Sequence, residues 1–154
     1  MQQSVETTPP AHVVIGNLIA SYAELVDDGD FAGVGVLLRH ATFTGGAGPV
    51  TGRDEVERML RDNVTLYEDG TPRTKHVTTN VAIEVDEQAG TAQARSYFTV
   101  LQALPGLPLQ AIASGRYQDR FERRGCEWHF VERRVRTDLA GDLTHHMRRA
   151  SADG

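Results

Sequence analysis

Three side chains in this sequence are of the types that carry out acid–base chemistry: the phenol of Tyr22, the carboxylate of Asp27 and the imidazole of His76. An imidazole can remove a proton from a carbon next to a carbonyl group. A carboxylate bonded to one imidazole nitrogen fixes the tautomer and raises the basicity of the other nitrogen. Tyr22 lies five residues before Asp27, so its phenol could reach the same site and polarise a carbonyl or a departing hydroxyl. Positioned proton transfer of this kind contributes about 10²–10⁴-fold to a reaction rate.

Each of these residues also has an ordinary structural interpretation. Tyr22 falls in an apolar helical stripe and could simply pack there with its hydroxyl satisfied. Asp27 stands beside Asp28, and either carboxylate could end a helix or form a hydrogen bond in a turn. His76 shares an extended segment with alternating threonines, which is also typical of a solvated histidine. Residue types and spacing alone leave both interpretations open.

The first half of the chain is predicted to be mainly helical. An amphipathic helix is expected from about residue 8, with Thr8 as cap, to about residue 28, because apolar residues recur at helical spacing. A shorter helix follows over residues 31–38, then an extended piece over 41–44 and a loop over 45–49. A third helix is predicted over residues 51–66, with Thr51 as its cap.

The second half is predicted to be an antiparallel sheet. Four segments rich in β-branched and aromatic residues are separated by short turns: 74–85, 91–104, 110–123 and 127–136. Neighbouring strands joined by such short links must run antiparallel. Helices followed by a long meander indicate the α+β class, with the helices covering one face of the sheet.

Size and composition indicate one globular domain. The chain has 154 residues, 40% of them hydrophobic and 24% charged, and a net charge of −5, which argues against a nucleic-acid-binding protein. No run of ~18 apolar residues, secretory signal or polybasic membrane signal is present, so a cytoplasmic protein is expected. The lone Cys126 and the absence of paired cysteine or histidine motifs predict no disulfide and no metal site. We expect a flexible lead-in over 1–9, one domain over 10–143, and a polar tail over 144–154 in which His145 and His146 are solvated.

Local stretches add a family resemblance. Residues 19–31 (IASYAELVDDGDF), 74–81 (TKHVTTNV), 114–121 (SGRYQDRF) and 128–134 (WHFVERR) resemble the SnoaL-like group of the nuclear transport factor 2-like superfamily. The resemblance covers roughly residues 11–143. It implies a curved antiparallel sheet wrapped around the N-terminal helices into a cone, the cystatin-like fold, with a small apolar ligand in its mouth. It also implies a homodimer or higher homo-oligomer.

The resemblance further implies how the first three residues are used. In the dehydratases of this group an aspartate at the end of the first helix pairs with a histidine on the first long strand, which implies that Asp27 and His76 face each other. His76 would then be a general base, Asp27 its orienting partner, and Tyr22 a donor to the developing oxyanion. The acidic residue that the bile-acid dehydratases carry on the second long strand is missing here, where residues 98–101 read FTVL. That departure sets a limit on how much of the mechanism is shared.

Polar residues of the meander are candidates for substrate binding. We nominate Tyr117, Thr99 and Arg133, although alternation alone does not decide which sheet face lines the cone. An ordinary solvated sheet or a subunit interface explains them as well. Arg133, with Arg134 and Arg136, could meet an anionic group or could be a surface arginine.

The expected function is therefore a cofactor-independent dehydratase or isomerase. It would act on a small hydrophobic cyclic oxygenated metabolite, steroid-like or polyketide-like, without metal, nucleic acid or membrane. The alternatives are a non-catalytic binding or assembly module of the same fold, a polyketide cyclase, or an epoxide hydrolase for which Asp119 would be the second carboxylate.

Overall fold

The computed structural model describes residues 7–148 of the chain. Its elements follow in the order α1 (Ala11–Asp27), α2 (Phe31–Leu37), β1 (Thr42–Gly45), β2 (Gly48–Thr51), α3 (Arg53–Asn63), β3 (Thr74–Asp86), β4 (Thr91–Leu104), β5 (Leu107–Arg124) and β6 (Glu127–Ala140). The predicted α+β order, with helices first and a four-strand meander afterwards, is confirmed. Most of the predicted lead-in lies outside the described residues.

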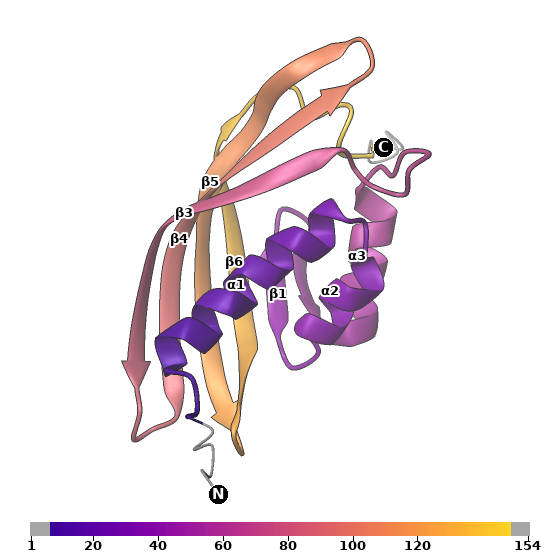
Figure 1. Ribbon diagram of the computed structural model, residues 1–154. Coiled ribbons are helices and arrows are strands. Elements are labelled where there is room, and N and C mark those ends of the chain that lie inside the picture. The colour runs from indigo at the N-terminus through magenta and orange to yellow at the C-terminus, as the bar shows by residue number, and fades with distance from the viewer. Residues whose placement is uncertain (1–6, 149–154) are drawn as a thin grey trace, which may run out of the picture.

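The sheet is curved and mixed rather than purely antiparallel. Its strand order is β2-β1-β6-β5-β4-β3, and β1 runs parallel to β6, with Thr42 opposite Glu132. A parallel neighbour is possible here because a long stretch of chain, including α3 and the four strands β2 to β5, connects β1 to β6. Figure 1 shows α1 crossing the concave face of the sheet, with α2 and α3 beside it. The helices thus cover one face, and no described helix covers the other.

Three local boundaries differ from the predictions. The loop expected over 45–49 is a tight hairpin in which Gly45 pairs with Gly48. Thr51 is the last residue of β2 and not a helix cap, because it pairs with Thr42 across that hairpin. Helix α3 therefore begins later, after Gly52, and it ends at Asn63 because Val64 is extended. Helix α1 begins after Pro10 without a side-chain cap, so the cap expected at Thr8 is wrong.

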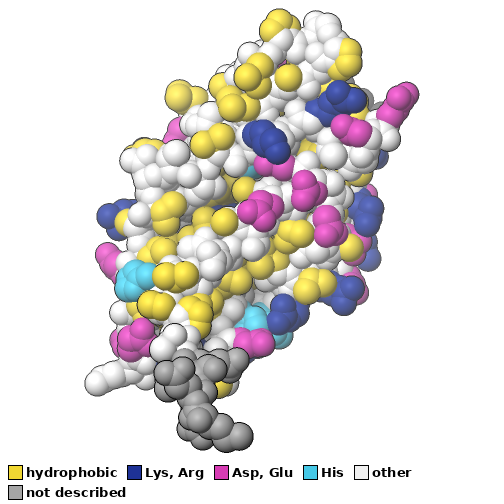
Figure 2. Space-filling model, in the orientation of Figure 1, with side chains coloured by type: hydrophobic (Ala, Val, Ile, Leu, Met, Phe, Trp, Pro, Cys, Tyr) yellow, Lys and Arg dark blue, Asp and Glu magenta, His cyan; other side chains and the backbone are white. Residues whose placement is uncertain are grey.

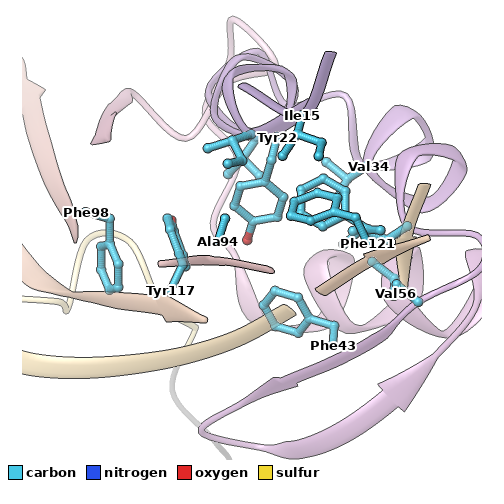
Figure 3. Packing of buried hydrophobic residues seen from close by; sticks show 14 of the residues in the cluster. Ile15, Tyr22, Val34, Phe43, Val56, Ala94, Phe98, Tyr117 and Phe121 are labelled. Atoms are coloured by element: carbon cyan, nitrogen blue, oxygen red, sulfur yellow. The ribbon is translucent and has the colours of Figure 1, made fainter. Parts of the chain in front are cut away.

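The core lies between α1 and the concave face of the sheet. Helix α1 buries one stripe of side chains there: Ala11, Ile15, Ile19, Tyr22 and Val26. Strand β4 buries every second residue from Ala92 to Gln102, which confirms the predicted alternation. Complete burial of one large apolar side chain stabilises a fold by about 1.5–3 kcal/mol. Figure 3 shows the aromatic part of this core, with Tyr22 projecting from its helix toward Tyr117 and Phe43.

The C-terminal segment, residues 142–148, packs back onto the domain. The backbone N–H of Thr65 donates to the carbonyl of His146 (2.8 Å), and that of Arg148 donates to the carbonyl of Asn63 (2.8 Å). Val64 and Met147 form an antiparallel bridge. The expected solvation is therefore wrong for His146, which is buried, whereas the side chain of His145 is exposed as expected; residues 149–154 lie outside the described range.

Charged side chains of both signs are interspersed on the surface shown in Figure 2. Hydrophobic side chains gather at the top of that view, where the β4–β5 hairpin protrudes in Figure 1. Leu109 of this hairpin is 70% exposed. Among the helices of the described residues, none is both long enough and apolar enough to cross a membrane.

Gly29 holds the turn that follows α1. Its φ is +73°, and a Cβ at this position would lie 2.0 Å from the carbonyl oxygen of Gly70. We expect Gly29→Ala to lower the free energy of unfolding by more than about 1 kcal/mol, because both the backbone conformation and the space exclude a side chain. Urea denaturation measures this change. Gly46→Ala is the control, since a Cβ at Gly46 meets no atom within 4 Å; equal stability of the two variants would contradict the expectation.

Candidate functional site

The structure brings Asp27 and His76 into direct contact. His76 Nδ1 lies 2.6 Å from Asp27 Oδ1, and the backbone N–H of His76 donates to Asp27 Oδ2 at 2.8 Å. The hydroxyl of Thr74 donates to Asp27 Oδ1 at 2.9 Å. The two side chains are nearly enclosed, at 9% exposure for His76 and 8% for Asp27. They form a fixed pair at the end of α1 and the beginning of β3.

These contacts determine the state of the pair. Burial raises the pKa of Asp27, but the hydrogen bonds and charge of His76 and the hydroxyl of Thr74 outweigh burial and leave this pKa below its ordinary value. An ionised Asp27 accepts a hydrogen bond from His76, so Nδ1 of the neutral imidazole carries the proton and Nε2 carries the lone pair. Nε2 of His76 makes no hydrogen bond to any described residue. It is available as a base.

Local structure explains why Asp27, and not Asp28, takes this position. Asp27 is the last residue of α1, and its side chain contacts the first residues of β3, whereas Asp28 is exposed. Thr74, His76 and Thr78 share the inward face of β3, as alternation predicts. Thr74 was missed as a partner of Asp27. Its position two residues before His76 was the signal that could have found it.

Tyr22 lies deeper in the cone. Its ring stacks on Phe43 with a centroid distance of 6.3 Å and meets the edge of Tyr117 at 5.9 Å. Burial raises the pKa of Tyr22, and the charge of Arg133 opposes that effect only in part. Tyr22 therefore stays a neutral phenol, which can donate a hydrogen bond. Tyr117 is buried beside it, and burial raises its pKa as well.

Arg133 is a fully buried cation. Its Nε and Nη2 donate to Asp119 Oδ1 and Oδ2 at 2.9 and 3.1 Å, and both side chains have 0% exposure. The guanidinium lies 3.7 Å from the ring centroid of Tyr117 and 4.2 Å from that of Tyr22. Its Nη1 is buried without a hydrogen-bond partner among the described residues. Arg133 is thus an inward, positively charged donor next to Tyr22.

Electrostatics keep the Arg133–Asp119 pair together. Burial raises the pKa of Asp119 above its ordinary value, and the charge and the hydrogen bonds of Arg133 offset that rise only in part. Burial lowers the pKa of Arg133, but Asp119 and the two tyrosines outweigh it, and the net direction is upward. Asp119 therefore depends on Arg133 to remain ionised, and an uncommitted second carboxylate for hydrolysis is not found at this position.

Thr99 lies away from these groups. The buried residues of β4 are the even-numbered ones from 92 to 102. Thr99 therefore points to the opposite face of the sheet, together with Tyr97, which is 45% exposed. Its hydroxyl is 3.2 Å from that of Ser114 on the same face. The nomination of Thr99 as a pocket residue is not supported by this placement. The pattern gave the correct alternation, but not which face the helices cover.

His146 was expected to be a solvated residue of the C-terminal tail, and the structure places it beside His76 instead. It is 7% exposed, and its ring centroid lies 6.2 Å from that of His76. Nδ1 of His146 is buried without a partner among the described residues. Burial and the charge of His76 lower the pKa of His146 to about 4, so it is neutral at ordinary pH. Nothing in the local sequence indicates this position, because it depends on the return of the C-terminal segment.

A groove of about 340 Å³ borders Asp27. Three apolar side chains line it together with seven polar or charged ones: Leu101, Ala103, Leu109, Asp27, Asp28, Asp69, Thr71, Arg73, Thr74 and Lys75. This groove is more polar than the apolar chamber expected from the sequence. Its volume is nevertheless in the range of small-molecule sites, roughly 300–1,000 Å³. No group of three or more metal-binding side chains is arranged to hold an ion in the part of the chain that the structure describes.

Comparison with known proteins places these features in context. Residues 10–134 match the model of the SnoaL-like domain. Solved structures with the cystatin-like fold of NTF2-like proteins also match. No curated protein sequence shows a significant match.

Three solved structures illustrate the likeness. A variant of the protein Rv3472 of unknown function, from Mycobacterium tuberculosis, is 25% identical with a TM-score of 0.68, over 82% of this chain and 76% of that one. A proposed scytalone dehydratase from Novosphingobium aromaticivorans is 20% identical with a TM-score of 0.67, over 85% and 86%. The hexachlorocyclohexane dehydrochlorinase LinA-type3 from Novosphingobium barchaimii is 19% identical with a TM-score of 0.68, over 87% and 90%.

Proposed function

This chain belongs to the SnoaL-like domain family, and on that premise we propose that it is a cofactor-free lyase or isomerase for a small cyclic oxygenated metabolite. The observation that carries the proposal is the 2.6 Å contact of His76 with Asp27, which leaves Nε2 of His76 as a base. Elimination of water from a β-hydroxy ketone, or a double-bond shift, matches this equipment. Steroid-like and polyketide-like ring systems are the substrate classes we propose.

The elimination proceeds in two proton transfers. Nε2 of His76 takes the proton from the carbon next to the carbonyl, and the electron pair moves onto the carbonyl oxygen. The neutral phenol of Tyr22 and Nη1 of Arg133, which has no partner among the described residues, are the donors we assign to this developing negative charge. The enolate then expels the β-hydroxyl, which takes the proton back from His76 and leaves as water. The product is an enone, and His76 returns to its initial state.

Similar proteins are consistent with an elimination. The names of the scytalone dehydratase-like and dehydrochlorinase structures denote loss of water and loss of hydrogen chloride, respectively. The groove beside Asp27 has a volume suited to a small ring system. For this chain the reaction and the substrate class are our proposal.

A non-catalytic binding module is the second candidate. Two observations favour it: side chains of the aromatic core fill the interior beside Tyr22, and the groove at Asp27 is mostly polar. A binding module would take up cyclic ketones without exchanging their α-protons. Polyketide cyclisation would use the same base and falls under the same test.

Asp27→Asn and His76→Gln test the proposed base. We expect each variant to fold and to lower kcat/KM by about 10²–10⁴-fold, because the base or its orienting partner is lost. The probes are bicyclic β-hydroxy ketones such as 3-hydroxy-1-tetralone, followed by product absorbance, and 1-tetralone, whose α-proton exchange in D₂O is followed by NMR. Glu24→Gln is the matched control, since Glu24 is an exposed carboxylate of the same helix and does not line the groove. Undiminished exchange in either site variant would remove the enzyme proposal.

A further inference from the structure

We propose that His146 is a second imidazole of this site and hydrogen-bonds the substrate oxygen while His76 takes the proton. The proposal rests on the proposed function and adds to it a residue from the far end of the chain. It also assigns the C-terminal segment, residues 142–148, a part in the site rather than a role in packing alone.

The first argument is position. The C-terminal segment is held on both sides of His146, by Thr65 at the carbonyl of His146 and by Asn63 at the N–H of Arg148. The carbonyl of the preceding residue, His145, accepts a hydrogen bond from Gln102 Nε2 at 3.2 Å. These bonds place the ring of His146 6.2 Å from that of His76, inclined at 62°. The backbone therefore places the ring of His146 beside the ring of His76.

The second argument is the unpartnered nitrogen. Buried polar side-chain atoms are nearly always hydrogen-bonded, and leaving one without a partner costs about 1–3 kcal/mol. Nδ1 of His146 is such an atom among the described residues. If the ring served packing alone, an apolar ring would fill the same space at lower cost. A nitrogen kept free beside a base is what recognition of a ligand oxygen requires.

The third argument is the division of labour between the two imidazoles. Burial lowers the pKa of His146 and keeps its imidazole neutral, whereas His76 is in direct contact with the carboxylate of Asp27. When the environments of two titratable groups differ in this way, one is suited to take the proton and the other to act as a neutral hydrogen-bonding partner. His146 undergoes no net protonation during the reaction: the proton passes from carbon to His76 and then to the departing hydroxyl.

Entry of a substrate between the rings requires movement. Nδ1 of His146 is shielded from solvent, so the proposal requires the C-terminal segment to move outward for entry and to return with its ring against the bound molecule. His146 is then a substrate contact in the closed state.

The experiment compares His146→Phe with His145→Phe. Both place the same apolar ring in the C-terminal segment, but the side chain of His145 is 43% exposed and that of His146 is enclosed. With 3-hydroxy-1-tetralone, His146→Phe is expected to lower kcat/KM by about 10²–10³-fold, the effect of losing one donor to the reacting oxygen. Its urea midpoint should be equal to or higher than that of the unmodified protein, because a buried unpartnered nitrogen is removed. His145→Phe should change kcat/KM less than about threefold.

Two further measurements keep the proposal falsifiable. His146→Gln retains a hydrogen-bond donor and is expected to recover at least part of the lost activity; it also serves if the phenylalanine variant fails to fold. Titration with 1-tetralone should shift the imidazole ¹⁵N signals of His146, and this readout needs no turnover. Unchanged signals of His146, or a His146→Phe variant with full kcat/KM, would overturn the proposal. Failure of the proposed function is seen separately, as undiminished α-proton exchange in the His76→Gln variant.

Discussion

Arg133→Met is expected to lower the free energy of unfolding by about 3–5 kcal/mol at neutral pH. The substitution keeps most of the side-chain volume but leaves Asp119 without its two hydrogen bonds, at a position with 0% exposure. An unpaired carboxylate in such a place is poorly solvated and must take up a proton or disrupt the packing. Because a proton relieves the charge, the deficit should shrink as the pH falls. Urea denaturation at several pH values measures it.

Two comparisons isolate the buried pair. Arg134→Met makes the same change at the adjacent residue, whose side chain is 63% exposed, and should alter stability by no more than about 0.5 kcal/mol. The double variant Arg133→Met with Asp119→Leu should recover most of the loss, because no unpaired charge remains. A double variant as unstable as Arg133→Met would show that lost packing against Tyr22 and Tyr117, and not the charge, is responsible.

Acidification from pH 7 to pH 4 should destabilise the unmodified protein by about 3 kcal/mol more than His146→Phe. His146 has an ordinary pKa of 6.5, and burial and the charge of His76 lower its pKa in the fold to about 4. Between these values the unfolded chain binds a proton that the folded chain excludes, so stability is lost as the pH falls through this window. A shift of one pKa unit corresponds to about 1.4 kcal/mol.

The groups facing His146 do not change this direction. His76 and Asp27 are present both in the unmodified protein and in the phenylalanine variant. The lowered pKa of Asp27 also makes stability fall as the pH falls. Their contribution therefore largely cancels between the unmodified protein and the phenylalanine variant. Denaturation curves for the two proteins at pH 7, 6, 5 and 4 give the difference directly. Parallel loss of stability in both would mean that His146 is protonated in the fold or reaches solvent readily.

Arg133 connects the packing of the core to the proposed chemistry, because it is a buried cation in contact with Tyr22. Arg133 occupies the place where an apolar cone would hold only hydrophobic side chains, and its cation is stabilised by Asp119 and by the faces of two tyrosines. Such an arrangement is weak evidence for stability in itself, since buried ion pairs are often replaceable by apolar groups. The charge lies beside Tyr22, and Nη1 of Arg133 has no hydrogen-bond partner among the described residues, which is why we propose it as a donor to the substrate.

Local sequence patterns determined the secondary structure and the residues that share a face of each element. The period of the apolar residues in α1 placed Tyr22 on the buried face, and strict alternation in β4 identified which residues share a side of the sheet. Turn residues separated the four long strands, and short links made them antiparallel. The family resemblance implied that Asp27 and His76 face each other, which the 2.6 Å contact shows.

Only the tertiary structure decided which surfaces and which distant segments meet. Alternation assigns Thr99 and Phe98 to opposite faces, but the helices decide that Phe98 is the buried one. The pairing of Arg133 with Asp119 depends on the register between β5 and β6, and β1 becomes parallel to β6 across a long connection. His146 reaches the site because the chain reverses after β6 and bonds to residues near the end of α3. Periodicity encodes which residues share a face, whereas long-range contacts are set by the packing of the whole chain, which no local stretch contains.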